Sequence, residues 1–115
     1  MLSGADNNGD DIWEKLVKKY ENISFVFCGH VSGMTCIGYS QMTGDNGNTV
    51  TAIIHDPSKL DYTAAPDGGG FVAMLYFSED GRQMTVRHYS TALDAFYGRE
   101  EQFSLEVDVL ETAAE

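Results

Sequence analysis

The sequence predicts an α+β fold, in which one N-terminal helix packs on a mostly antiparallel sheet of five to six strands. Apolar residues between positions 12 and 20 recur with the spacing of a helix, whereas those after position 23 lie in short β-branched and aromatic runs. Four of these runs are joined by links of hairpin length, which favours antiparallel pairing. A helix that is separate along the chain from a series of strands is typical of α+β architecture.

The helix is predicted to begin at Asp11. This residue can cap the helix, and Glu14 follows at the three-residue spacing of a capping box. Asn22 is a suitable stop, and Trp13 is interpreted as a core anchor. The apolar stripe on one face of this helix consists of Ile12, Trp13, Leu16, Val17 and Tyr20.

The predicted strands cover residues 23–28, 34–43, 49–55, 71–77 and 83–90, and a sixth, acidic edge strand is predicted over 103–109. Residues 44–48 and 79–81 have the composition of tight turns. The first strand is almost wholly apolar, which predicts that both of its faces are covered. If the first two strands form a hairpin centred on Ser32, then Cys28 and Cys36 face each other. Two buried free thiols are the favoured alternative, because nothing in the sequence indicates an oxidising compartment.

Length and charge limit the function. A chain of 115 residues has room for one small domain, which we expect over residues 11–110, between a flexible lead-in at 1–10 and a tail at 111–115. A net charge of −11 argues against nucleic acid and anionic membranes as partners, since both require basic surfaces. The sequence has no signal or transmembrane pattern, so a soluble protein is expected, and the compartment is not indicated.

A long loop is predicted over residues 56–70, where it holds both prolines and three consecutive glycines. Loops of this length are usually functional, or they lie where a missing neighbour would pack. The glycines do not form a phosphate cradle, because no helix and no Lys-Ser/Thr pair follows them.

The three histidines are the main candidates for chemistry. His55 is interpreted as a surface residue in contact with Asp56, and His88 as structural. His30 differs, because it follows Gly29 at the end of an apolar strand. A histidine at that place projects from a rigid element, and the glycine allows a close approach.

Two segments resemble a known family. The amphipathic stretch 12–17, followed by Asn22, Ile23 and the run Val26-Phe27-Cys28-Gly29-His30-Val31, resembles the C-terminal part of calcineurin-like metallophosphoesterases. The later strands agree in order, so the resemblance covers residues 9–107. It implies half of a metallophosphoesterase sandwich, with metal-dependent phosphoester hydrolysis by a longer parent that holds divalent metals (Mn, Fe or Zn). It also implies that His30 is a metal ligand, the first histidine of the family's Gly-His-x-His motif.

The departures from the family pattern bear on activity. Ser32 stands in place of the second histidine, and a hydroxyl is a poorer ligand than imidazole. The family's Asp-x-His, Gly-Asp and Gly-Asn-His-Asp/Glu motifs are missing; the sequence Gly44-Asp45-Asn46 is discounted because it lies in a predicted turn. Hydrolysis with two metals needs both ions. The chain alone is therefore expected to be inactive, with no catalytic residue and no cofactor of its own.

Two kinds of partner are compatible with this interpretation. The chain can pair with a missing N-terminal half, or it can associate with itself through an exposed sheet. The alternative function is a stand-alone interaction or assembly module that keeps the sheet and has lost the metal site. A calcium-responsive acidic domain is a third alternative, disfavoured because the sequence contains no preorganised calcium loop.

Overall fold

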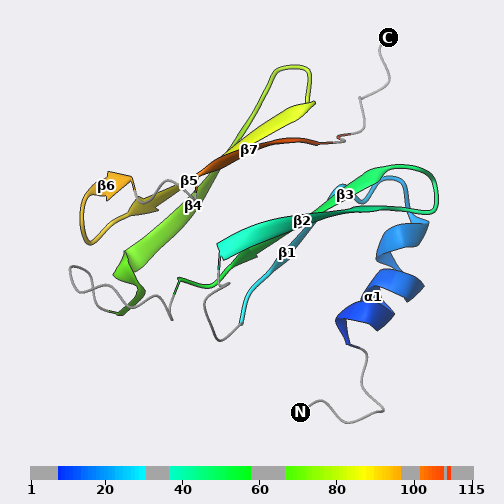
Figure 1. The fold of residues 1–115 in the computed structure, drawn as a ribbon, viewed down its shortest axis with the longest axis horizontal. Helices are drawn as coiled ribbons and strands as arrows, with labels where there is room; N and C mark the ends of the chain where they lie inside the picture. The colour runs from blue at the N-terminus through cyan, green and yellow to red at the C-terminus, as the bar shows by residue number, and fades with distance from the viewer. Residues whose placement is uncertain (1–7, 31–36, 58–66, 97–101, 108, 110–115) are drawn as a thin grey trace.

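The computed structural model describes residues 8–30, 37–57, 67–96, 102–107 and 109, and Figure 1 shows their arrangement. The described chain is α+β, as predicted, and it contains one α-helix and seven strands in two mostly antiparallel sheets. Its helical elements are α1 (Gly9–Lys15) and the 3₁₀ turns η1 (Val17–Lys19) and η3 (Asp67–Gly70). Within the part of the chain described, no helix is long and apolar enough to cross a membrane.

The strands form two separate sheets rather than one. The first sheet contains β1 (Phe25–Cys28), β2 (Ile37–Thr43) and β3 (Thr49–His55), with β3 in the centre. The second contains β4 (Phe71–Phe77), β5 (Gln83–Ser90), β6 (Ala95–Phe96) and β7 (Phe103–Glu106), and β5 pairs with the other three. The predicted bounds are confirmed for β3, β4 and β5, and β6 was not predicted. The acidic sixth strand ends at residue 106 rather than 109.

The pairing of β1 corrects the sequence prediction. This strand runs parallel to β3, with Phe25 opposite Thr51, and β2 pairs with the other edge of β3. The expected hairpin of the first two strands is therefore wrong, and Cys28 does not face β2. A parallel pair needs a crossover connection, and here that connection contains β2 itself. Cys36 and Ser32 lie outside the described residues.

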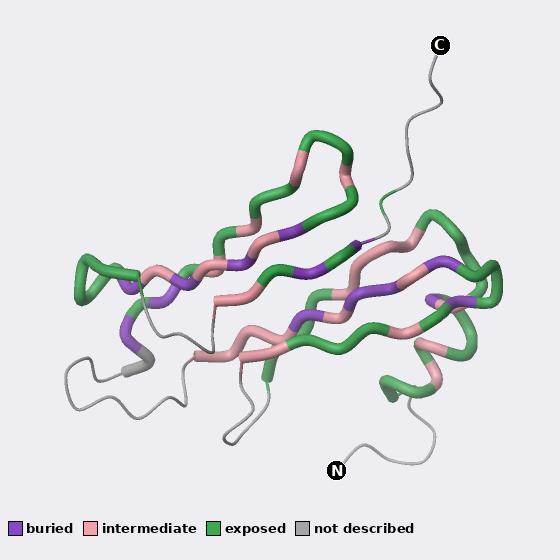
Figure 2. Tube along the Cα trace, turned by 45° about the horizontal axis from the view of Figure 1, so that its top comes forward, coloured by how far each residue is buried: buried purple, intermediate pink, exposed green. Residues whose placement is uncertain are grey.

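The two sheets pack face to face and bury the core between them (Figure 2). Among the contacts that join the layers directly, the rings of Tyr39 and Phe103 lie 4.7 Å apart, and Gln41 Nε2 donates a 2.6 Å hydrogen bond to the carbonyl of Glu106. Each fully buried aliphatic side chain contributes about 2 kcal/mol to the free energy of unfolding. The chain thus supplies both layers of a small sandwich. The core residues are Ile53, Met84, Val86, Leu105 and Val107, with Phe25, Leu75 and Phe103 packed against them.

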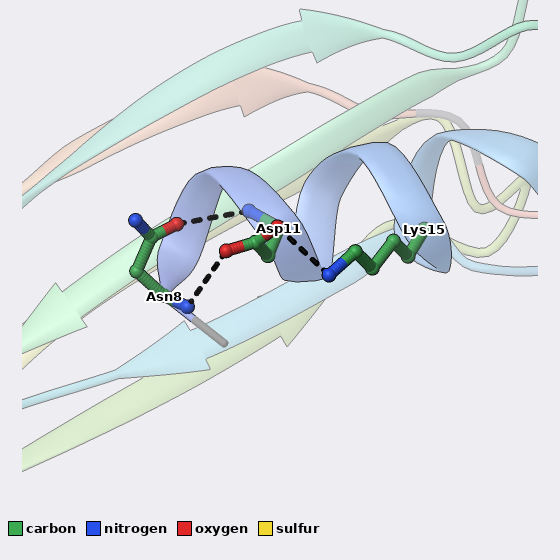
Figure 3. A network of polar contacts seen from close by, with 3 residues as sticks. All are labelled: Asn8, Asp11 and Lys15. Carbon is green, nitrogen blue, oxygen red and sulfur yellow. Dashed lines mark hydrogen bonds and ion pairs between the residues drawn. The ribbon is translucent and has the colours of Figure 1, made fainter. Parts of the chain in front are cut away.

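The helix begins three residues earlier than predicted. Asn8 is the N-cap and accepts a 3.0 Å hydrogen bond from the Asp11 N–H, while the Asp11 carboxylate accepts one from the Asn8 N–H (Figure 3). Asp11 also forms a 2.9 Å ion pair with Lys15. Asp11 is therefore the N3 member of the capping box, not its cap. Of the residues assigned to the lead-in, Asn8 caps this helix and residues 9 and 10 lie in it; residues 1–7 and 110–115 lie outside the described chain.

The helical segment is joined to the first sheet at the β2–β3 turn. Asp45 N donates to the Lys18 carbonyl at 2.7 Å, and Asn46 Nδ2 donates to the Lys19 carbonyl at 3.1 Å. Val17 is buried, whereas Trp13 is only partly buried and is not a core residue, contrary to its predicted role. The remaining apolar stripe of Ile12, Leu16 and Tyr20 is about half exposed.

Candidate functional site

His30 lies where β1 leaves the first sheet. Its side chain is exposed, and its backbone φ of 61° is in the left-handed region. Non-glycine residues rarely adopt this conformation, although histidine does so more often than most. The preceding Gly29 approaches β3 closely, since a Cβ built on it would lie 3.4 Å from the His55 carbonyl oxygen. The parallel strands β1 and β3 therefore end together, and His30 projects from that shared end.

The other two histidines form a stacked pair between the sheets. The rings of His55 on β3 and His88 on β5 have centroids 5.1 Å apart and planes inclined by 14°. His88 is fully buried and His55 is partly buried. His55 Nδ1 has no hydrogen-bond partner among the residues that the structure describes. The ring of His55, predicted as a surface residue, thus faces the interior of the sandwich, and the structural role predicted for His88 agrees with its burial.

This pair was not predicted from the sequence, although the parity of the two residues on their strands was a signal for it. His88 has the same parity on its strand as Met84, Val86 and Ser90, and all four are buried. His55 has the parity of the core residue Ile53. Because side chains of equal parity share a face, both histidines belong to inward-facing sets.

A hydrogen-bonded network fixes the backbone beside the histidine pair. The buried Ser90 Oγ donates to the Gly69 carbonyl at 2.6 Å and accepts from Leu93 N at 3.1 Å. Thr91 Oγ1 donates to the Gly70 carbonyl at 2.8 Å. Gly69 and Gly70 have φ values of 64° and 58°, so these two positions favour glycine. The glycines of the predicted long loop therefore set the start of β4; residues 58–66 of that loop lie outside the described chain.

The described residues do not fit a two-metal centre. No group of three or more His, Cys, Asp or Glu side chains within the described ranges is placed to hold a metal ion. His30 offers one exposed imidazole, and the His55–His88 pair is turned into the interior. A divalent metal at a catalytic site usually needs at least three protein ligands. No hydrolytic step can therefore be derived from these residues alone.

Cys28 is a free thiol, and it is exposed rather than buried as predicted. Its Sγ lies 3.4 Å from the Ile53 carbonyl oxygen, so it donates a weak hydrogen bond to the neighbouring strand. The adjacent Phe27 is 62% exposed. The prediction that both faces of this strand are covered is therefore wrong: β1 is an edge strand, and only part of its apolar surface reaches the core.

A second surface feature lies on the outer side of the second sheet. Val72, Met74 and Tyr76 alternate along β4 and are exposed there; we call them the outer β4 face. On the neighbouring strand the Arg87 guanidinium lies 3.9 Å from the centroid of the Phe96 ring. The Tyr89 hydroxyl donates a hydrogen bond to the Asp94 carboxylate, and this contact, reinforced by partial burial, raises the pKa of Tyr89 above its ordinary value.

Comparison with known proteins gives no match: no family model, curated protein or solved structure matches this chain. The function must therefore be inferred from the residues and their geometry.

Proposed function

We propose that the chain is the C-terminal part of a calcineurin-like metallophosphoesterase and is catalytically incomplete by itself. In the complete enzyme, His30 supplies one metal ligand, and an N-terminal half supplies the other ligands. The observation that carries the proposal is the placement of His30, an exposed imidazole held in a left-handed backbone at the shared end of β1 and β3. The sequence resemblance over residues 9–107 supports the same assignment.

The placement of His30 suits a metal ligand that acts together with ligands from another part of a longer polypeptide. An imidazole that extends from the end of paired strands is held by a rigid element and is open to a second group of ligands. A single imidazole holds a divalent ion weakly, but it completes a site when carboxylates and further imidazoles approach from outside. The metals supply Lewis-acid activation of the phosphoester when they are bound. In this proposal the chain contributes one donor atom, from the imidazole of His30, and holds it in place.

The test has two parts. The chain alone should not hydrolyse bis-p-nitrophenyl phosphate in the presence of manganese, and turnover that His30→Ala abolishes would contradict the proposal. The coding region upstream of Met1 should encode the Asp-x-His and Asn-His-Asp/Glu motifs in frame. The longer polypeptide should then hydrolyse the ester, and His30→Ala should lower its kcat/KM by more than about 100-fold. The matched control is Glu21→Ala, a substitution of an exposed residue away from His30.

A second candidate function is a non-catalytic interaction or assembly module. It is favoured by the apolar surface exposed on the outer β4 face and on the helical stripe of Ile12, Leu16 and Tyr20. Exposed apolar patches of this kind mark interaction sites in soluble proteins. The replacement of the second motif histidine by Ser32 also suits this function. If the longer polypeptide lacks the metal motifs or has no esterase activity, that result would support the interaction or assembly module.

A further inference from the structure

The helical segment formed by α1 and η1 is held at each end by an asparagine that precedes a glycine. At its start, the Asn8 Oδ1 accepts a 3.0 Å hydrogen bond from the Asp11 N–H. At its end, the Asn46 Nδ2 in the β2–β3 turn donates a 3.1 Å hydrogen bond to the Lys19 carbonyl. These two asparagines form the Asn-Gly pairs of the sequence. Both ends of the segment therefore depend on a side-chain amide that lies next to a glycine nitrogen.

An Asn-Gly pair can lose its side-chain amide without an enzyme. The glycine nitrogen attacks the asparagine Cγ and forms a C–N bond, its proton leaves with the side-chain NH₂ as ammonia, and a succinimide ring remains. Water then opens the ring, adding its OH to one of the two ring carbonyl carbons and its proton to the nitrogen, which gives aspartate or isoaspartate. Glycine favours the reaction because it has no Cβ beside the attacking nitrogen. Gly47 is exposed, and a Cβ built on it would meet nothing within 4 Å, so its surroundings do not block the ring.

The fold restrains both reacting groups at Asn46. The Gly47 N–H donates a 3.0 Å hydrogen bond to the Gly44 carbonyl and thereby closes the turn. The Asn46 amide is held on the Lys19 carbonyl, so its Cγ turns toward the Gly47 nitrogen only after that hydrogen bond opens. The rate of the reaction therefore depends on how often the helical segment separates from the β2–β3 turn.

We propose that Asn46 is a site of spontaneous deamidation and that its product releases the helical segment from the first sheet. A carboxylate cannot donate a hydrogen bond, so aspartate at this position loses the bond to Lys19 and places a negative charge beside its carbonyl oxygen. Isoaspartate also adds a carbon to the backbone of the turn, where the Asp45 N–H donates to the Lys18 carbonyl at 2.7 Å. The segment then cannot dock as before, and the modification makes the separation permanent.

The same chemical change has a different effect at the start of the segment. Asn8 acts there as an acceptor, and aspartate is as good an N-cap as asparagine. A negative charge at the start of a helix also suits the helix dipole. Asn8→Asp is therefore the matched control for Asn46→Asp. The two substitutions change the same atoms, but only the second removes a hydrogen bond that holds the segment.

The first experiment follows the full chain during incubation at mildly alkaline pH, by peptide mapping with mass spectrometry. Asn46 should change to a mixture of aspartate and isoaspartate, whereas Asn22 and Asn48, which precede larger residues, should stay intact. Val17→Ala should accelerate the change at Asn46 about 10-fold, because it truncates the buried side chain of η1. Leu16→Ala alters a side chain that is 50% exposed and should have little effect. In denaturing urea, the rate at Asn46 should be the same in all three chains.

The second experiment measures the release with the two aspartate variants. Asn46→Asp should accelerate exchange of the Asp45 amide about 5-fold after correction for intrinsic exchange, because one of the hydrogen bonds that dock the segment is lost. Asn8→Asp should leave this exchange unchanged. Circular dichroism should show that both variants keep the strand content.

Three results would overturn the proposal: an Asn46 as intact as the two control asparagines, equal rates in the two helix variants, or equal exchange of the Asp45 amide in the two aspartate variants. The proposal is independent of the phosphoesterase function, because the reaction involves no metal. His30→Ala should leave the rate at Asn46 unchanged, and failure of either proposal leaves the other standing.

Discussion

The imidazole rings of His55 and His88 stack across the interface between the two sheets, with centroids 5.1 Å apart. They lie at the end of the sandwich from which His30 projects, because Gly29 reaches the backbone of His55. The stack is turned inward, whereas His30 is exposed. One end of the fold thus combines an inward-facing histidine pair, which links the layers, with a single histidine whose side chain is exposed.

Replacing His88, the fully buried member of the pair, should lower the stability of the fold more than replacing His55. His88→Ala should lower the free energy of unfolding by about 3 kcal/mol, because it removes a fully enclosed ring and leaves a cavity. His55→Ala should cost about 1 kcal/mol, because that ring is partly exposed and its site can be filled by water. Urea denaturation measures both values, and equal costs would show that the buried ring does not link the sheets as described.

The glycine at the start of β4 should be intolerant of a side chain for steric reasons. Gly70 and Gly47 both have positive φ, but a Cβ at Gly70 would collide with Thr91 Oγ1, whereas one at Gly47 meets nothing within 4 Å. Gly47→Ala should cost about 1 kcal/mol from backbone strain alone. Gly70→Ala should cost at least twice as much. Thermal denaturation tests the pair of variants, and a Gly70→Ala variant as stable as Gly47→Ala would refute the predicted collision.

The capping box should make the helix sensitive to acid. The ion pair with Lys15 and the hydrogen bond from the Asn8 N–H lower the pKa of Asp11. Since this folded-state pKa lies below the unfolded value, the stabilisation is present above the ordinary carboxyl range near pH 4 and is lost as the pH falls through the lowered pKa. The protection factors of the Ile12 and Leu16 amides, whose N–H groups donate within this helix, should fall over that range once the rates are corrected for intrinsic exchange.

Two variants test the same helix at neutral pH. Asn8→Ala should remove about 1 kcal/mol of helix stability and should accelerate the exchange of the Ile12 and Leu16 amides. Asp10→Asn, an acidic residue of the first turn outside the capping box, should have a smaller effect. Equal acceleration in both variants would mean that first-turn charge, rather than the box, holds the helix.

Tyr89 should titrate above the ordinary range of a phenol near pH 10. The hydrogen bond that its hydroxyl donates to Asp94 raises its pKa, so the stabilisation is complete below the unfolded pKa and is lost as the pH rises through the folded one. Asp94→Asn should lower the pKa of Tyr89 toward the ordinary value. Ultraviolet titration of the phenolate, with Tyr89→Phe subtracted to isolate this residue, measures the change. An unchanged titration in Asp94→Asn would contradict the assigned hydrogen bond.

The sequence predicts the individual strands well because alternation and turn composition are local properties. The bounds of β3, β4 and β5 agree with the structure for this reason. The partner of β1 could not be predicted in the same way. The short link to β2 favours a hairpin of β1 with β2, whereas in the structure β3 pairs with both of these strands. The division into two sheets depends on such long-range pairing, which no local pattern specifies.

The candidate site was predicted in part. His30 was identified because Gly29 and the end of an apolar strand are visible in the sequence. The His55–His88 stack needs the register of two sheets, since the residues come from strands 33 positions apart in the numbering. The helix start was misplaced because Asn8 and Asp11 satisfy the same capping pattern as Asp11 and Glu14, and only the backbone shows which pair forms it.

The parallel pairing of β1 with β3 also favours one order of assembly over another. The β2–β3 hairpin closes through one tight turn, whereas Phe25 must find Thr51 after 26 intervening steps along the chain. Closing the longer loop costs more entropy, so we expect β1 to join a hairpin that has already formed. A short strand at an edge that joins late is also among the first to detach. We therefore expect the segment that carries His30 to be the part of its sheet that detaches most readily.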